Sequence, residues 1–376
     1  MDKSKKKTYK ILFLSHSANA GNDDLFLGSK IKTELSKYFD TLNVNYFEKD
    51  YFRSKPKSIN IALKYKNTGI INKLLNLAFI YKTNFKLIKT KQYDLIWLGV
   101  TSSFINYFIF IYPLLIKKQK YFVQTFTPSV KPSRIRRYLA DLFLALNFRF
   151  FQHIGVGLER NIKAYRLKEK QAVMINIGVH DYGFYERDYT KVKLLYLGTL
   201  NNREVWKSVE ALGLYLQKNN EIPVEYNIIG AGYESEVKKL KSVIANYKLE
   251  SIVRYHGYLP TEKVREFFQY SNVGVAYVPV NEYFQNSSSK TLEYLISGMP
   301  VIATNNSFRG KIINGKCGVL TQDNTESFAQ GLKKLIDNIN NYNTQEIRNM
   351  FKEYTMENSF KNSYVPKLVN IIENRN

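Results

Sequence analysis

Short apolar runs alternate with longer stretches of mixed apolar and polar residues along the whole chain. The runs lie at 9–15, 42–47, 93–99, 120–126 and 153–157, and then at 192–198, 224–230, 252–258, 273–279, 300–304 and 317–321. The runs have the length of buried strands, and the stretches between them have the length of helices. This alternation is typical of parallel sheets with helices on both faces. The sequence therefore predicts an α/β fold.

The length of 376 residues suits two such domains. The polar stretch "HDYGFYERDYTK" (180–191) contains no strand-like run, so we expect the first domain at 1–183 and the second at 184–355. From about residue 342 the pattern is that of amphipathic helices. The last of these is expected at 356–376, as a separate C-terminal helix.

The positive charge is concentrated in the first half of the chain. Residues 1–175 carry 32 Lys and Arg against 11 Asp and Glu, whereas residues 176–376 carry 24 against 21, within a total net charge of +24. A one-sided charge predicts an anionic partner for the first domain, such as lipid headgroups, nucleic acid or an acidic polymer. A solvated, lysine-rich surface is the alternative.

Two segments of the first half combine apolar and basic residues. The longest apolar run, 104–116, is interrupted by Asn106 and Pro113 and is too short to cross a membrane, which takes about 20 residues. The segment 131–151 begins with basic residues and becomes aromatic and leucine-rich. Such segments suit the surface of an anionic bilayer, although a pair of core helices with basic tips explains each of them equally well. The single cysteine, Cys317, and the absence of a visible secretory leader favour a reducing cytoplasm.

Ligands of open parallel sheets bind at the carboxyl ends of the strands. Three loops in that position contain glycine: "SANAGNDD" (17–24), "LGTLNNRE" (197–204) and "IIGAGYESE" (228–236). A lone G-x-G is weak evidence for a nucleotide, because a tight strand-to-helix turn needs the same residues.

The stretch "NSSSKTLEYLISGMPVIATN" (286–305) predicts a short helix followed by a buried strand. Serines at 287–289 are favoured N-cap residues, and Gly298 followed by Pro300 ends the helix. Lys290 would lie in the first turn, where a cation opposes the helix dipole by roughly 0.3–1 kcal/mol.

A bound anion would remove this cost. It would be held by the backbone N–H groups of Ser288 and Ser289 and by the ammonium of Lys290. One turn further, Glu293 can accept hydrogen bonds from two vicinal hydroxyls, as on a ribose, and a phosphate beside a ribose is a nucleotide. The alternative is a local Lys290–Glu293 ion pair, worth about 0.2–0.5 kcal/mol.

The block "SSSKTLEYLISGMPVIAT" resembles the donor-site helix of GT-B-fold glycosyltransferases of family 4, in which the pattern K-x-x-E-Y-x-x-x-G-x-P-V-I recurs. Three further blocks, 194–212, 226–240 and 253–279, are similar to other blocks of this family and come in the same order. The resemblance covers about 193–340, and the first half is similar only in architecture. It implies the GT-B fold: two Rossmann-like domains with a cleft between them, and a C-terminal helix that packs back toward the N-terminal domain.

The resemblance implies three catalytic residues, Arg203, Lys290 and Gln285. Arg203 and Lys290 match basic residues that neutralise the donor diphosphate. Glu293 matches the second glutamate of the E-x7-E motif, which binds the donor ribose. Gln285 stands in place of the first glutamate, and it keeps the hydrogen bonds but loses the charge.

The donor-binding residues implied in the same way are Gly198, Lys207, Gly230, Gly232, Tyr258, Ser288, Ser289 and Glu293. Thr199 stands where many members of the family have an arginine, so one phosphate contact is missing or is supplied by Lys207. The acceptor-side candidates are Gly21, His16 and Thr127. The family often has a histidine after the fourth N-terminal strand, whereas this chain reads "QTFTPS" there.

The resemblance implies a retaining, metal-independent glycosyltransferase. The sequence contains no D-x-D motif and no cluster of ligands with metal-binding spacing, so neither a metal nor another cofactor is expected. The expected partners are a nucleotide-sugar donor, with a UDP-sugar as first choice, a lipid-linked or glycan acceptor, and an anionic membrane. We expect a bacterial enzyme of surface-glycan synthesis, peripheral on the cytoplasmic face of the membrane.

Two other classes remain open at the level of sequence. A nucleic-acid-binding protein would explain the charge, and its tyrosines could stack on bases, but no recognised nucleic-acid motif is present. A nucleotide-sugar epimerase would keep the fold, but its acid and base carboxylates cannot be assigned. A glycan phosphorylase of this fold would be longer or would need a lysine bound to pyridoxal phosphate.

Overall fold

The computed structural model describes residues 8–18, 27–47, 58–66, 69–90, 92–100, 104–125, 133–176, 178–219, 222–280 and 289–374. The contacts divide the chain into two compact units. Unit 1 consists of Met1–Gly178 together with Met356–Asn376, and unit 2 consists of Val179–Thr355. The chain therefore crosses between the units twice. The first crossing lies five residues before the boundary expected at 183/184.

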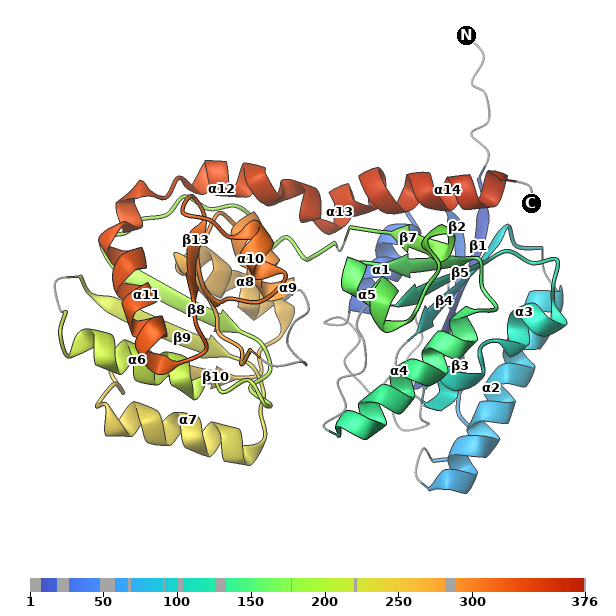
Figure 1. The fold of residues 1–376 in the computed structure, drawn as a ribbon, viewed down its shortest axis with the longest axis horizontal. Coiled ribbons are helices and arrows are strands. Elements are labelled where there is room, and N and C mark those ends of the chain that lie inside the picture. The colour runs from blue at the N-terminus through green and yellow to red at the C-terminus, as the bar shows by residue number, and fades with distance from the viewer. Residues whose placement is uncertain are drawn as a thin grey trace, which may run out of the picture. The chain divides into compact units, whose positions relative to one another are not determined.

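Unit 1 is built on a parallel sheet with the strand order β3-β2-β1-β4-β5-β6-β7 (Figure 1). Its strands are β1 (Lys10–Ala18), β2 (Asp40–Phe47), β3 (Ser58–Ala62), β4 (Leu95–Val100), β5 (Tyr121–Thr125), β6 (His153–Val156) and β7 (Ala172–Met174). Its helices are α1 (Leu27–Leu35), α2 (Ile70–Thr90), η3 (Phe104–Phe108), α3 (Ile111–Leu115), α4 (Arg134–Phe148), α5 (Glu159–Ala164), η4 (Glu169–Gln171), α13 (Met356–Ser359), η7 (Phe360–Tyr364) and α14 (Val365–Glu373).

Both faces of this sheet are buried, which explains why its central strands read as continuous apolar runs. Successive residues of β1 enter different cores: Ile11 and Phe13 pack with α1, η7 and α14, and Leu12 and Leu14 pack with α2 and α4. The C-terminal helices thus form part of unit 1. None of the described helices combines the length and the hydrophobicity that crossing a bilayer requires.

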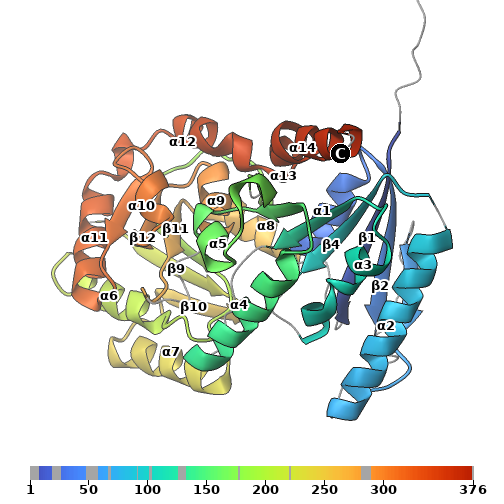
Figure 2. The same ribbon diagram turned by 45° about the vertical axis from the view of Figure 1, so that its right-hand side comes forward.

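Unit 2 has a second parallel sheet, with the order β10-β9-β8-β11-β12-β13 (Figure 2). Its strands are β8 (Val192–Leu197), β9 (Val224–Ile229), β10 (Val253–Gly257), β11 (Val273–Ala276), β12 (Val301–Thr304) and β13 (Gly318–Thr321). Its helices are α6 (Trp206–Leu216), α7 (Glu234–Asn246), α8 (Thr261–Tyr270), α9 (Ser289–Ile296), α10 (Arg309–Ile312), α11 (Thr325–Asp337), η5 (Ile339–Asn341), α12 (Thr344–Phe351) and η6 (Lys352–Tyr354).

The strand order of unit 2 reverses between β8 and β11. In doubly wound sheets this switch point opens a crevice outside the carboxyl ends of the strands, and ligands bind there. The loops after β8 and β11 and the helix α9 surround this point. The fold is thus that of two parallel-strand Rossmann-like sheets covered by helices, as the sequence predicts.

Candidate functional site

The loops that follow β8 and β9 approach each other more closely than side chains would allow. A Cβ atom on Gly230 would lie 1.8 Å from the carbonyl oxygen of Gly198, and Gly230 has a φ of +147°. The Gly198 N–H donates to Ile229 O (3.0 Å), and the Gly230 N–H donates to Gly257 O (2.7 Å). Glycine is therefore required at 230, and the loops after β8, β9 and β10 form one connected edge.

Gly232 and Tyr258 belong to the same edge. A Cβ on Gly232 would lie 2.7 Å from the Leu200 Cβ, and the Tyr233 N–H next to it donates to Asn201 Oδ1 at 2.6 Å. Tyr258 follows β10, and its side chain is 49% exposed. The structure thus brings the predicted residues Gly198, Gly230, Gly232 and Tyr258 together at the carboxyl ends of adjacent strands.

The helix α9 is anchored over the switch point by Tyr294. The hydroxyl of Tyr294 accepts the N–H of Leu197, the last residue of β8, at 2.6 Å. The Tyr294 ring packs on Gly274 of β11, where a Cβ atom would lie 2.4 Å from the ring. Burial holds the pKa of Tyr294 well above its usual range, so this hydroxyl stays protonated. The anchor fixes the first turns of α9 beside the ends of β8 and β11.

The first turns of α9 carry the ion pair that the sequence offered as an alternative to an anion site. Lys290 Nζ lies 2.8 Å from Glu293 Oε2. The pair is not a surface feature, because the Glu293 side chain is only 5% exposed while that of Lys290 is 32% exposed. Burying a carboxylate is costly unless it is paired. Lys290 thus stabilises a carboxylate that lies inside the site.

The basic residues after β8 differ in how their charge is balanced. Lys207 Nζ lies 2.6 Å from Glu204 Oε2 and 4.0 Å from Asp323 Oδ1. Arg203 is half-buried in the turn before α6. The pKa of Arg309 is lowered mainly by burial and, to a smaller extent, by the positive charge of Arg203. The positive charge of Lys207 is therefore matched by Glu204 of the same loop and by Asp323 after β13, and Arg203 lies near a second cation.

Arg309 is a residue that sequence reasoning missed. It is fully buried at the start of α10, and its Nε donates to Thr291 Oγ1 at 3.2 Å. Its Nη1 donates to the carbonyl and the hydroxyl of Thr304, at 3.2 and 3.1 Å, and its Nη2 finds no hydrogen-bond partner among the residues that the structure describes. The sequence "NNSFRGK" places an arginine after β12, but nothing in it shows that the side chain turns inward under α9.

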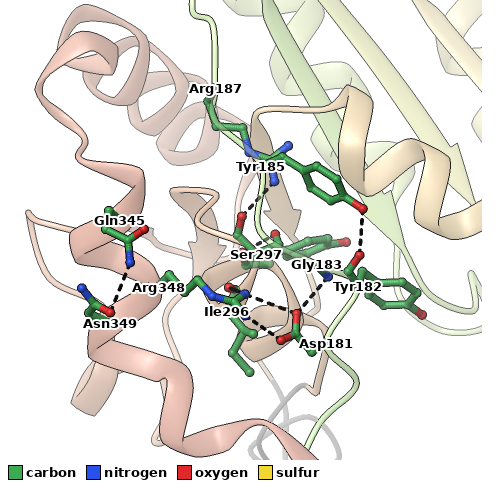
Figure 3. Close-up of polar contacts among 11 residues, drawn as sticks. Asp181, Tyr182, Gly183, Tyr185, Arg187, Ile296, Ser297, Gln345, Arg348 and Asn349 are labelled. Carbon is green, nitrogen blue, oxygen red and sulfur yellow. Dashed lines mark hydrogen bonds and ion pairs between the residues drawn. The ribbon is translucent and has the colours of Figure 1, made fainter.

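The C-terminal end of α9 is held by two arginines from distant segments (Figure 3). Arg348 of α12 donates to Ile296 O at 2.7 Å and pairs with Asp181 at 2.8 Å. Arg187 donates to Ser297 O at 2.8 Å and to Ser271 O at 2.6 Å. Cations at a helix C-terminus satisfy its last carbonyls and stabilise its dipole.

Five predicted residues cannot be placed fully. Gln285, Ser288, Gly21 and Thr127 lie outside the described residues, and His16 lies on β1 in a part where only the backbone is described. Ser289 is the first residue of α9. Within the described ranges, no group of three or more His, Cys, Asp or Glu side chains has an arrangement that could hold a metal ion.

Comparisons with known proteins agree with this arrangement. Residues 191–338 match the model of the family described as "Glycosyl transferases group 1", so unit 2 contains a group 1 glycosyltransferase domain. The matched residues include every predicted site residue of unit 2. The chain is thus a glycosyltransferase, and its fold is of the GT-B type. A search among curated proteins found no match for the sequence.

Solved structures share the fold over nearly the whole chain. Alr3699/HepE of Anabaena, solved with UDP and glucose, has a TM-score of 0.69 at 15% identity, covering 96% of this chain and 99% of its own. Sucrose-phosphate synthase of Thermosynechococcus elongatus has a TM-score of 0.71 at 13% identity, covering 97% and 99%. The lipopolysaccharide outer core galactosyltransferase WaaB has a TM-score of 0.65 at 16% identity, covering 96% and 99%. At these identities the likeness is one of fold.

Proposed function

We propose that the protein transfers a sugar from a nucleotide-sugar donor to a lipid-linked or glycan acceptor in bacterial surface-glycan synthesis, as a family 4 enzyme. The observation that carries this proposal is the buried Lys290–Glu293 pair in the first turns of α9, beside the switch point of the unit 2 sheet. Glu293 Oε2 is taken by Lys290, and Oε1 remains to accept a ribose hydroxyl. A diphosphate would then lie between the start of α9 and Arg203.

The solved relatives support this choice of substrates. Alr3699/HepE was solved with UDP, with UDP and glucose, and with UDP-glucose. WaaB transfers galactose to the lipopolysaccharide outer core, as its description states. A UDP-sugar is therefore our first choice of donor, and a glycan or lipid-linked glycan is our choice of acceptor.

We further propose that the reaction retains the anomeric configuration and needs no metal. The acceptor hydroxyl oxygen bonds to the anomeric carbon while the bond from that carbon to the diphosphate oxygen breaks. The departing phosphate takes the hydroxyl proton, which leaves a glycoside and a nucleoside diphosphate. Negative charge grows on the leaving diphosphate, and Arg203, Lys290 and the N-terminal N–H groups of α9 are placed to stabilise it. Gln285 would hold a hydroxyl of the donor sugar.

A thermal-shift panel tests the donor assignment. A ligand that binds only the folded state raises the melting temperature. We expect one nucleoside diphosphate among UDP, GDP and ADP to stabilise the protein, while CMP, inorganic phosphate and a short duplex DNA do not. Stabilisation by the DNA alone would favour a nucleic-acid-binding protein and would remove the basis for a donor site.

Glu293→Ala tests the ribose contact within the same panel. Without the Glu293 carboxylate, the ribose hydroxyls lose their hydrogen-bond acceptor. Since a hydrogen bond to a charged group contributes about 1.5–3 kcal/mol, affinity for the stabilising nucleotide should fall at least tenfold. Glu326→Ala is a control, because Glu326 also lies near the start of a helix of unit 2 but is exposed. Equal affinities in the two variants would refute the assignment of Glu293.

The membrane part of the proposal rests on one surface of unit 1. The segments 104–116 and 131–151 pack on each other: the Phe110 N–H donates to Asn147 Oδ1 at 3.0 Å, and the rings of Tyr107 and Phe143 stack at 5.4 Å. Their exposed large apolar side chains define what we call the α3–α4 surface: Leu114, Leu115, Ile135, Tyr138, Leu139, Phe143, Leu146 and Phe150.

Exposed cations border the α3–α4 surface. Lys117 and Lys118 follow α3, Arg136 lies in the first turn of α4, and Arg149 follows that helix. Apolar side chains flanked by Lys and Arg are the pattern of a protein that lies on an anionic bilayer without crossing it. We therefore propose that the enzyme is peripheral, on the cytoplasmic face of the membrane.

Vesicle flotation tests this surface. We expect binding to vesicles that contain phosphatidylglycerol, little binding to pure phosphatidylcholine, and loss of binding in Phe143→Glu. Lys333→Glu, on the exposed side of α11 in unit 2, changes the net charge more than Phe143→Glu does and should keep binding. Equal binding to both kinds of vesicle at physiological salt would refute the membrane assignment.

A further inference from the structure

Arg309 is a cation that the fold buries without a counter-ion. Its side chain is 0% exposed, and its three hydrogen bonds go to neutral oxygens of Thr291 and Thr304. No ion pair of this guanidinium is found among the described residues, and Nη2 is buried without an acceptor. A buried charge is costly unless an opposite charge or a full set of hydrogen bonds compensates it. An anion within reach of Nη2 would provide this compensation.

The unpartnered nitrogen points toward the start of α9. In a planar guanidinium, the Nε–H group and one N–H of Nη2 lie on the same edge and point the same way. Since Nε donates to Thr291, the third residue of α9, Nη2 lies on the side that faces this first turn. Since the Nε–H is already donated to Thr291, Nη2 is the group of this edge that is left to bind an oxygen of a phosphate or carboxylate. The Nη2 group of Arg309 thus points toward the place where the donor phosphates are proposed to bind.

A second cation lies close to Arg309. The charge of Arg203 lowers the pKa of Arg309, after the larger effect of burial, to about 10, and both residues lower the pKa of Tyr196. Arg309 remains protonated at neutral pH, so two positive guanidinium groups repel each other at the carboxyl ends of β8 and β12. An anion bound between them would turn this repulsion into attraction to both.

Arg309 also lies where a cation is missing from the loop after β8. Thr199 stands where the resembling family often has an arginine, and Lys207 is balanced by Glu204. The hydroxyl of Tyr196 donates to Thr199 O at 3.0 Å, so Thr199 lies beside the Tyr196 ring. The charge of Arg309 lowers the pKa of the same tyrosine. The guanidinium of Arg309 thus lies near position 199, where this chain has threonine.

We propose that Arg309 is a phosphate-binding residue of the donor site, and that it binds the diphosphate through Nη2 in place of the arginine absent at 199. This inference rests on the proposed function, because it takes the anion to be the diphosphate of a nucleotide-sugar. It adds a residue from α10, which the matched sequence blocks do not assign. The ligand class is a nucleoside diphosphate, and the contact is with its phosphates and not with its base or ribose.

The test compares how the wild type and Arg309→Met bind UDP and uridine, and GDP, ADP and their nucleosides in parallel, by isothermal titration. We expect Arg309→Met to weaken binding of the nucleoside diphosphate at least about tenfold and to leave nucleoside binding unchanged. Lys333→Met removes one exposed charge from the same unit and should change neither affinity. If Arg309→Met binds the diphosphate as tightly as the wild type, or loses affinity for the nucleoside equally, the inference is overturned.

Arg309→Lys keeps the test decisive if Arg309→Met does not fold, and a double variant extends the test if it does. Arg309→Lys keeps the charge and most of the side-chain volume but loses the planar guanidinium. It should therefore weaken diphosphate binding by less than Arg309→Met does. The double variant Thr199→Arg with Arg309→Met restores an arginine from the β8 loop and should recover diphosphate affinity. Failure of Arg309→Lys to weaken binding, or of Thr199→Arg to restore it, would contradict the proposed replacement.

The failure of this inference differs from a failure of the proposed function. If the wild type binds none of UDP, GDP and ADP, the donor site itself is wrong. If the wild type binds one of them and every Arg309 variant binds it equally well, the donor site stands and Arg309 has no part in it.

Discussion

At the scale of single residues, the cations around α9 differ in what balances their charge. Lys207 has Glu204, Lys290 has Glu293, and Arg309 has only neutral oxygens. A charge that is already paired has less to offer an incoming anion than one that is not. This ranking makes Arg309 the stronger candidate for phosphate contact and leaves Lys207 a structural role in its loop.

Arg203→Ala should lower turnover more than it weakens donor binding, because Arg203 is placed to meet charge that grows in the transition state. We expect kcat to fall about ten- to a thousandfold, with a smaller change in the Kd for the donor nucleotide. Lys207→Ala is the control and should have the weaker effect on kcat. Steady-state kinetics with a saturating sugar donor measure both. An unchanged kcat in Arg203→Ala would contradict its role.

A separate residue-scale feature is the buried carboxylate of Glu225 on β9. Burial alone would raise its pKa, but hydrogen bonds from Lys191, Asn227 and Tyr270 outweigh burial and lower the pKa to about 2. A carboxyl whose pKa is lower in the folded state stabilises the fold above its unfolded pKa. That contribution is lost as the pH falls from about 4.5 toward 2.

Glu225→Gln should therefore destabilise the protein at pH 7 by about 1–2 kcal/mol after allowance for solvent screening, and by much less near pH 2.5. Urea unfolding at the two pH values measures the difference. Glu262→Gln, at an exposed position in the first turn of α8, is the control and should have little effect at either pH. A difference that does not depend on pH would show that charge is not the cause.

The sequence predicted which polar residues belong to this site better than it predicted their burial and the direction of their side chains. The sequence made two features recognisable: the helix that carries Lys290 and Glu293, and the glycines that bring the neighbouring loops together. Both were recognisable because cap residues and turn glycines act locally. Whether Glu293 is buried depends on what packs over α9, and the inward path of Arg309 depends on the space under the first turn. Both are properties of packing between segments far apart in the chain.

At the scale of elements, α9 is a short helix held in place through its C-terminal half. Tyr294 holds it to β8, while Arg187 and Arg348 hold its C-terminal carbonyls. Arg187 comes from the segment that enters unit 2, and Arg348 comes from the helix before the chain leaves it. The position of the proposed donor contacts thus depends on residues at the two ends of unit 2.

Arg348→Met should weaken this support. Loss of the contacts to Ile296 O and Asp181 should reduce the free energy of unfolding by about 1–3 kcal/mol. Lys316→Met removes an exposed ion pair to Glu346 of the same helix α12, and should cost at most about 1 kcal/mol. Urea unfolding followed by circular dichroism measures both variants. Similar losses in the two would show that Arg348 acts as an ordinary surface charge.

Most of the strands that the sequence predicted are buried along most of their length, and β10, an edge of the unit 2 sheet, is the exception. Each of the apolar runs corresponds to a strand, whereas β3 (Ser58–Ala62) and β7 (Ala172–Met174) were not predicted. These two strands form the edges of the unit 1 sheet, and their residues are mostly only half-buried. An edge strand needs no continuous apolar run, so it leaves a weaker pattern in the sequence.

At the scale of the whole molecule, unit 1 is assembled from both ends of the chain. Tyr364 is buried against Trp97 of β4, with ring centroids 5.8 Å apart, and against Phe360 at 4.4 Å. Lys120 at the start of β5 donates to the carbonyl of Ile372 at 2.7 Å and so satisfies the C-terminal end of α14. The last helices are therefore part of the core and not an appendage.

Tyr364→Ala should destabilise unit 1 by about 3–5 kcal/mol, because it removes a large buried ring. The two tryptophans make this measurable, since Trp97 lies in unit 1 and Trp206 in unit 2. In a Trp206→Phe background, fluorescence reports unit 1 alone. Lys361→Ala, exposed in the same turn, is the control. An unchanged unfolding midpoint in Tyr364→Ala would show that the C-terminal helices do not stabilise the sheet.

The two crossings also impose an order on folding during synthesis. Unit 2 is an insertion within unit 1, and its two ends meet where the Val179 N–H donates to Tyr354 O at 2.8 Å. A ribosome therefore completes unit 2 before it releases the residues that finish the core of unit 1. Unit 2 can fold at once, whereas one face of the first sheet, which α1 covers only in part, stays incomplete until residues 356–374 emerge. The first half of this protein is thus the part that depends longest on protection by chaperones.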